Sequence, residues 1–190
     1  TFDVIAPGIA KHEEEIVLAP GADPKSDPCL ALRAAVAAAE FGLPIAPGTL
    51  QNLKSCPIDD RTWNDESRSL FLRLLASGPA LLQVWEEIDF VDIPGRLIPE
   101  WLAIRNRPSA SAAHRYTIDR HSVEVVTRLG RETPRGNRYD DRHYQALLLA
   151  GILHDVGKRP GVFDHAAEGA RHASMVLKRM GFDRDIIWWV

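Results

Sequence analysis

The chain has 190 residues, of which 45% are apolar and 26% are charged, a composition typical of one or two globular domains. At this size, folding buries about 70% of the surface that the unfolded chain exposes. The formal net charge of −3 gives no electrostatic reason to expect a nucleic-acid or membrane partner. No apolar run approaches the roughly 20 residues needed to cross a bilayer, and the N-terminus shows no secretory signal.

The two cysteines, Cys29 and Cys56, lie in different parts of the sequence and show no metal-binding spacing. A disulfide is an alternative, but reduced thiols in a cytoplasmic protein are the better interpretation. The chain begins without Met and stops inside the apolar run 186–190, so we expect it to be a segment of a longer protein.

The first half of the chain predicts an irregular stretch followed by helices. Residues 1–27 are expected to be irregular, with one short strand possible at 15–18. An Ala- and Leu-rich helix follows at 30–41 and ends at Gly42, and short turns around one helical turn follow at 44–57. Asn64 or Asp65 can cap a helix that runs to about residue 77, and Gly78 and Pro79 make a short turn into the next helix.

The second half is also helical. A connector at 94–107 leads to a subdomain boundary near residue 110, which separates a helical segment, 1–110, from a second domain, 111–190. We expect helices from about residue 117 to Gly130, then at 142–155, 164–180 and 183 onward, with a charged loop at 131–140. With no convincing β pattern, the expected fold class is all-α.

A metal site is predicted where the apolar helix 142–155 ends. The helix is apolar on every side, which is typical of a central helix, and it ends in the sequence His-Asp-Val-Gly-Lys at 154–158. Burial of His154 and Asp155 is costly unless both are paired, and a divalent metal accepts both imidazole and carboxylate ligands. His121 lies at the margin of the inward stripe of the helix before it, where it can face the same ion.

These motifs are those of the HD superfamily of metal-dependent phosphohydrolases, which the chain resembles from about Tyr116 onward. A closer resemblance, to the family of bifunctional PII uridylyltransferase/uridylyl-removing enzymes, covers most of the chain. It rests on the string from His114 to His121, on Leu153 to Lys158 and on the Asp164-His165 pair, with further similarity at 68–75, 97–101 and 105–108.

The resemblance implies a function, a cofactor and a partner. Enzymes of this family hydrolyse the phosphodiester between a nucleotide and a tyrosine of the PII nitrogen-regulatory protein, which releases UMP. It implies an HD-domain helical bundle with His121, His154 and Asp155 as ligands of a divalent metal, Mg or Mn or another transition metal. Asp155 would also orient the attacking water.

The family's nucleotidyltransferase domain and its glutamine-sensing ACT domains are not expected within these residues. A fourth metal ligand, an Asp from a later helix, is expected beyond Val190, so we expect the HD domain to be truncated here and its metal affinity to be weak.

Four further residues are weaker candidates. Lys158 can contact a phosphate or can be a solvated cation at a helix end. His165 and Asp164 can lie behind the metal ligands, hold a second metal or simply begin a helix. His114 is expected to pack behind the ligands, and His12, His143 and His172 are expected to be ordinary surface or helix-face residues.

Two alternatives to the PII-specific activity stay open. One is another HD enzyme that hydrolyses free nucleotides. The other is a non-catalytic, RNA-binding helical domain, favoured by the locally basic stretch that contains Arg105, Arg107, Arg115, Arg120 and Arg128 but opposed by the net charge.

Overall fold

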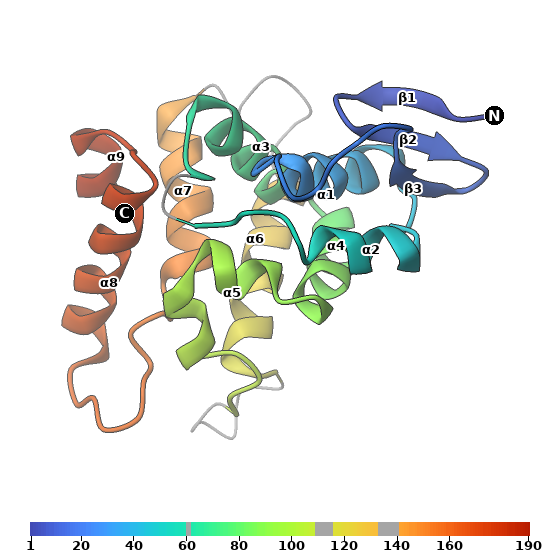
Figure 1. Cartoon of the computed structure of the whole chain (residues 1–190). Coiled ribbons are helices and arrows are strands. Elements are labelled where there is room, and N and C mark those ends of the chain that lie inside the picture. The colour runs from blue at the N-terminus through green and yellow to red at the C-terminus, as the bar shows by residue number, and fades with distance from the viewer. Residues whose placement is uncertain (60–61, 109–115, 133–140) are drawn as a thin grey trace.

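The computed structural model describes residues 1–59, 62–108, 116–132 and 141–190, and within these ranges the chain is mainly helical. Figure 1 shows a small sheet at one end of the molecule and α8 and α9 at the other, with the remaining helices between them. The all-α expectation is confirmed for the bulk of the described chain, and the sheet is an addition to it. The described elements are β1 (Asp3–Ala6), β2 (Ile9–His12), β3 (Glu15–Leu18), α1 (Leu30–Phe41), α2 (Pro47–Leu53), α3 (Asp65–Leu75), α4 (Ala80–Phe90), α5 (Ile93–Leu97), the 3-10 helix η2 (Pro99–Ala103), α6 (Ile118–Glu132), α7 (Arg142–Leu153), α8 (His165–Arg179) and α9 (Arg184–Trp189).

The expectation of an irregular N-terminus was wrong for residues 3–12, because residues 3–18 form an antiparallel sheet in the order β1-β2-β3, and the strand expected at 15–18 is confirmed as β3. Each strand has four residues, too few for a clear alternation of apolar and polar side chains. The tight turns between the strands are the clearer evidence for the sheet. Gly8 has a φ of 75° and Glu13 a φ of 54°, the left-handed backbone that tight turns need.

The predicted helix ends are confirmed where short polar side chains or glycines supply the caps. Asn64 caps α3 with its side chain, which accepts from the backbone N–H of Ser67, while the Ser67 hydroxyl accepts from the N–H of Asn64. Gly42 ends α1 in the left-handed conformation. Gly78, at a φ of 65°, provides the turn between α3 and α4.

Gly130 does not end a helix, as the sequence suggested, because α6 continues to Glu132. Its role is close packing. A Cβ at position 130 would lie 2.7 Å from the backbone nitrogen of Gly78 and 3.1 Å from the carbonyl oxygen of Ala76. The missing side chain therefore lets α6 approach the turn between α3 and α4.

One continuous hydrophobic core joins residues from both sides of the predicted boundary near residue 110. It includes Phe71 and Leu74 from α3, Val126 from α6, and Leu148 and Ile152 from α7, all fully buried. The division into two parts stays a prediction. Because α7 packs against α3, α6, α8 and α9, its C-terminal end has neighbouring helices on several sides.

The long helix α8 is joined to η2 by an ion pair. The guanidinium of Arg179 donates two hydrogen bonds, of 2.9 and 2.6 Å, to the carboxylate of Glu100, which is buried. Burial raises the pKa of Glu100, but the hydrogen bonds from Arg179 outweigh this effect, and the pKa of Glu100 is lowered from its ordinary value of 4.5.

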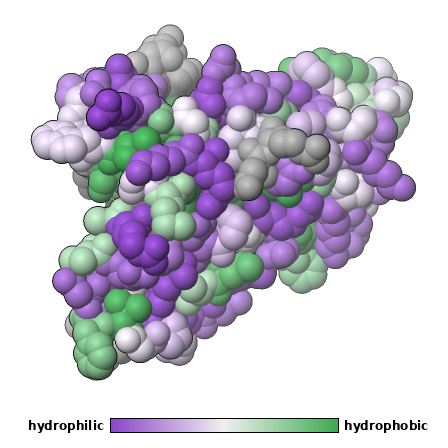
Figure 2. Space-filling model, turned by 60° about the vertical axis from the view of Figure 1, so that its left-hand side comes forward, coloured by the Kyte–Doolittle hydropathy of each residue, from purple (hydrophilic) through white to green (hydrophobic). Residues whose placement is uncertain are grey.

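On the face drawn in Figure 2, hydrophilic residues cover most of the surface and hydrophobic residues form small separate patches. The large exposed apolar side chains include Leu147 of α7, Met175 of α8 and Trp188 of α9. Among the described residues, no helix has both the length and the apolar character that crossing a bilayer requires.

We predict that Gly130→Ala destabilises the protein by about 1–3 kcal/mol, because the added methyl group would overlap backbone atoms that have no side-chain freedom to move. Gly48→Ala is the matched control. Gly48 also lies in a helix, and a Cβ there meets nothing within 4 Å, so this variant should be neutral or slightly stabilised. Urea unfolding of both variants measures the difference, and equal stabilities would contradict the packing role of Gly130.

We also predict that Glu100→Gln destabilises the protein by about 1–3 kcal/mol at neutral pH, because Arg179 loses its charged partner. The folded-state pKa of Glu100 is lowered, so the ion pair contributes its full stability above about pH 4.5 and loses it as the pH falls through the folded-state value. The difference in the free energy of unfolding between the variant and the wild type should therefore become smaller at acidic pH. Glu40→Gln removes the exposed pair with Arg73 and should change stability by less than about 1 kcal/mol. A Glu100→Gln penalty that is the same at every pH would rule out the linkage.

Candidate metal centre

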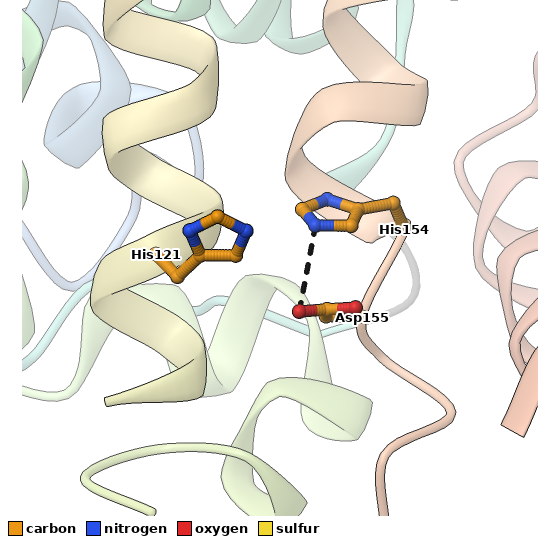
Figure 3. Close-up of side chains that lie close together, drawn as sticks. All are labelled: His121, His154 and Asp155. Atoms are coloured by element: carbon orange, nitrogen blue, oxygen red, sulfur yellow. Dashed lines mark ion pairs between the residues drawn. The ribbon is translucent and has the colours of Figure 1, made fainter. Parts of the chain in front are cut away.

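Two histidines and one aspartate meet between the helices α6 and α7. His121 comes from the first turns of α6, His154 follows the last residue of α7, and Asp155 comes next in the chain. One ligand atom of each residue lies within 4.8 Å of the others, and this is the one group of metal-ligating side chains so placed in the described chain. Figure 3 shows the two rings and the carboxylate pointing toward a common space.

Close packing of α6 against α7 sets the distance between the two histidines. At Gly151, a Cβ would lie 3.0 Å from the side chains of Leu129 and Val126 on α6, which is tighter than most real contacts. The absence of that side chain brings the helices together one turn before His154. The rings of His121 and His154 then lie with their centroids 5.3 Å apart and their planes at 75°.

A backbone contact fixes the protonation of His154. Its Nδ1 lies 2.8 Å from the carbonyl oxygen of Gly151, which can only accept a hydrogen bond, so Nδ1 carries the proton. In the neutral ring, Nε2 then keeps its lone pair, and Nε2 is the atom that faces Asp155, at 3.4 Å from Oδ2. This arrangement of a metal-binding imidazole with a backbone acceptor behind it is common in metal sites.

Asp155 is the buried member of the group. Its Oδ2 accepts a hydrogen bond of 2.9 Å from Nζ of Lys158, one turn further along the chain. Burial raises the pKa of Asp155, but its interactions with His154 and with the ammonium group of Lys158 outweigh this effect and lower the pKa to about 2. The hydrogen bond to Asp155 raises the pKa of His154, against the smaller opposing effect of burial. Asp155 is therefore ionised at neutral pH and attracts a cation.

The segment after Asp155 is packed directly against α8. A Cβ at Gly157 would lie 2.7 Å from the Cα of Gly169 on α8, so the two backbones touch where both residues are glycine. The contact sets the path of residues 155–158 relative to α8. It explains the glycine at position 157 in the His-Asp-Val-Gly-Lys sequence, whereas a Cβ at Gly169 would make only ordinary contacts, the nearest at 3.7 Å.

The donor set fits a divalent transition metal. Two neutral imidazoles and one carboxylate suit ions such as Mn²⁺, Fe²⁺ or Zn²⁺, whereas Mg²⁺ prefers a shell of oxygen ligands. His121 faces the shared space from α6, and His154 and Asp155 face it from the end of α7 (Figure 3). An ion held by them would keep positions open for water or substrate oxygens.

The other candidate residues lie in varied places. Lys158 contacts Asp155, as described above. Asp164 is the N-cap of α8 and accepts from the backbone N–H of Ala167, and His165 is the exposed first residue of that helix. His114 lies outside the described residues.

Two expectations about histidines were wrong. His154 is more exposed than the buried helix end implied, because it follows the last helical residue and opens to solvent. His172 is buried rather than on the surface, with its Nε2 at 2.7 Å from Oε1 of Glu168. The signal that the sequence offered for His172 was its spacing, since it lies one helical turn after Glu168 on the same face of α8.

Several known proteins that are similar to this chain share the same functional description. The chain is 40% identical over 181 residues to a bifunctional uridylyltransferase/uridylyl-removing enzyme of Streptomyces coelicolor, a match that covers 94% of this chain and 21% of the relative. The enzyme with the same description from Mycobacterium tuberculosis is 39% identical over 92% of the chain, and that of Corynebacterium glutamicum is 34% identical over 83%.

The chain spans about a fifth of the length of these relatives. No family model matches the chain. No solved structure matches it either.

We predict that the chain binds one Mn²⁺ ion and that His154→Ala weakens the binding at least tenfold, because one of three ligand atoms is lost. His143→Ala is the matched control, since His143 lies at the other end of α7, is exposed and stays outside the group. Titration calorimetry at pH 7.5 measures both. Equal affinity of the two variants would place the ion elsewhere.

Proposed function

We propose that this chain carries the uridylyl-removing site of a bifunctional uridylyltransferase/uridylyl-removing enzyme, built as an HD-type phosphohydrolase domain. The observation that carries the proposal is the group of His121, His154 and Asp155, which the motif predicted and the fold brings together. The relatives with this description match almost the whole chain and support the same activity. The proposed reaction is the hydrolysis of the phosphodiester that joins UMP to a tyrosine of PII.

The chemistry of that substrate suits the site. A divalent ion bound by the three residues would polarise the phosphoryl oxygen and make water a better nucleophile near neutral pH. The tyrosine leaves as a phenolate, and because a phenol has a pKa near 10 it leaves more readily than an aliphatic alcohol. The reaction therefore needs little help from a general acid, and among the described residues Lys158 is the cation that contacts Asp155.

Each residue of the candidate metal centre has a defined role in the proposed reaction. His121 and His154 hold the ion through ring nitrogens, and the backbone carbonyl of Gly151 keeps the proton of His154 on the far nitrogen. Asp155 holds the ion through one carboxylate oxygen and can orient the attacking water with the other. Lys158 keeps Asp155 in place and can turn to a phosphate oxygen when the substrate is bound.

The RNA-binding alternative loses part of its support because two of its five arginines, Arg105 and Arg120, are held in ion pairs. Arg105 pairs with Asp89 and Asp92, and Arg120 pairs with Glu86 and Glu124. A guanidinium that is neutralised by two carboxylates contributes little to a phosphate-binding surface. These ion pairs favour the hydrolase over the RNA-binding domain.

We predict that Asp155→Ala in the full-length enzyme abolishes the release of UMP from uridylylated PII and leaves the addition of UMP unchanged. The reason is that the proposed hydrolytic site loses its buried, ionised ligand, while a transfer reaction would use a different domain. Release is followed in the presence of Mn²⁺ by the mass of PII, and addition is measured with the same preparation as the internal control.

Two outcomes would contradict the proposal, and a third would require the control variants. Undiminished release by Asp155→Ala would show that the hydrolase lies elsewhere. Equal loss of release and addition would indicate a folding defect, which His154→Ala and the control His143→Ala would then separate from a site defect. Rapid hydrolysis of free nucleotides by the wild type, with none on uridylylated PII, would support the other HD enzyme.

A further inference from the structure

The chain between α7 and α8 forms a projecting loop beside the metal centre. Figure 1 shows this segment extending beyond the adjoining ends of both helices. We call residues 158–164 the α7–α8 loop. It begins at Lys158, whose ammonium group donates to Asp155 at 2.9 Å, and it ends at Asp164, the N-cap of α8. The first residue of the loop therefore contacts a candidate metal ligand.

Backbone contacts hold the two ends of the α7–α8 loop together. A Cβ at Gly157 would lie 2.4 Å from the carbonyl oxygen of His165 and 2.3 Å from the backbone nitrogen of Gly169. Residues 157 and 165 flank the loop, and Gly157 lies two positions after Asp155, so both ends of the loop start beside the metal centre. Compact surface loops whose ends meet in this way frequently carry function.

Turns within the α7–α8 loop define its path. The backbone N–H of Arg159 donates to the carbonyl oxygen of Gly157 at 2.8 Å, and that of Val162 donates to the carbonyl oxygen of Arg159 at 3.4 Å. Gly161 has a φ of 75°, a conformation that residues with a side chain rarely adopt. Phe163 follows directly after this turn, so the turn determines the direction in which the loop presents its aromatic ring.

The side chain of Phe163 is fully accessible to solvent. It is 100% exposed, the highest value for a large apolar residue in the described part of the chain. A phenyl ring in this position adds no packing to the fold and leaves its whole apolar surface in water, which is unfavourable. Phe and Arg are among the residue types enriched where proteins bind one another. Phe163 therefore has the chemistry and the exposure of an anchor for a partner.

Arg159 adds a positive charge to the same loop. Its Nε donates to the carbonyl oxygen of Val156 at 3.3 Å, which holds the guanidinium beside the residue that follows Asp155. In contrast to Arg105 and Arg120, it pairs with no carboxylate of the described chain, and its terminal nitrogens make no hydrogen bond within those residues. A guanidinium in this state can bind an acidic group through two parallel hydrogen bonds.

The proposed reaction requires a protein to approach the metal centre. The modified tyrosine reaches the ion together with its neighbouring residues, and those residues must contact the surface that surrounds the site. The α7–α8 loop is part of that surface, because both of its ends lie beside the metal centre. An exposed aromatic ring and an unpaired guanidinium on this loop match a protein surface that carries apolar and acidic groups.

We propose that the α7–α8 loop docks the protein substrate of the hydrolase. Phe163 packs against an apolar side chain of that protein, and Arg159 pairs with an acidic group near the modified tyrosine. Both contacts form outside the metal centre, so they strengthen the binding of the substrate without changing the chemical step. This inference rests on the proposed function, because it assigns the loop to the substrate of that reaction.

Steady-state kinetics of UMP release from uridylylated PII, with the full-length enzyme and Mn²⁺, test the proposal. Phe163→Ala should raise KM by about fivefold or more and change kcat by less than about twofold, because the lost contact is equally strong in the ground state and the transition state. Phe163→Tyr keeps the aromatic ring and should retain a KM close to that of the wild type. Phe90→Ala is the matched control, because Phe90 is 76% exposed but belongs to α4.

The charge of Arg159 is tested by the dependence of KM on salt. The KM of the wild type should rise as the KCl concentration is raised, because dissolved ions screen the attraction between charged groups. Arg159→Gln should have a higher KM than the wild type at low salt and a weaker dependence on KCl.

The outcomes separate this inference from the proposed function. Release of UMP by the wild type together with an unchanged KM in Phe163→Ala, or with a loss of kcat alone, would overturn the docking role of the loop. An equal rise of KM in Phe90→Ala would also overturn it, because the effect would then not be specific to the loop. An identical salt dependence in Arg159→Gln and the wild type would contradict the role of Arg159. No release by the wild type would contradict the proposed function itself, and the docking inference with it.

Discussion

The close packing of α6 against α7 is the constraint on which the candidate metal centre depends. The two helices bring their ligands from positions about thirty residues apart in the sequence, and no covalent link holds them at the correct distance. The glycine at position 151 allows that approach, and its carbonyl oxygen also orients the imidazole of His154. Gly151 therefore contributes in two ways. The absence of a side chain permits the close packing, and its carbonyl oxygen accepts the hydrogen bond from His154.

The charge of Asp155 is the second feature on which the candidate metal centre depends. Asp155 is buried and yet strongly acidic, because its hydrogen bond from Lys158 and its interaction with His154 outweigh the cost of burial. This balance keeps a negative charge beside two imidazoles, where a cation can replace the contacts that the residues make with each other.

The sequence predicted the helices and the grouping of His121, His154 and Asp155 because both depend on local signals. Caps such as Asn64 and Asp164, and the apolar helix that ends in His154-Asp155, are read from neighbouring residues. The errors came from interactions between segments far apart in the chain. Gly130 looked like a helix end because its contact with Gly78 joins residues more than fifty positions apart, and the short strands of the sheet depend on their turns and their partners. The burial of His172 and the pairing of Arg179 with Glu100 likewise arise only after the helices pack.

The contact between Gly157 and Gly169 has a mechanical consequence. Where two helices meet through side chains, a small displacement of one helix can be absorbed by a change of rotamer. Here backbone lies on backbone, so there is no rotamer to change. A translation of α8 must move the peptide at residue 157, which lies two residues after Asp155 and next to Lys158. The position of this long outer helix is thus transmitted to the buried carboxylate without attenuation by any flexible side chain.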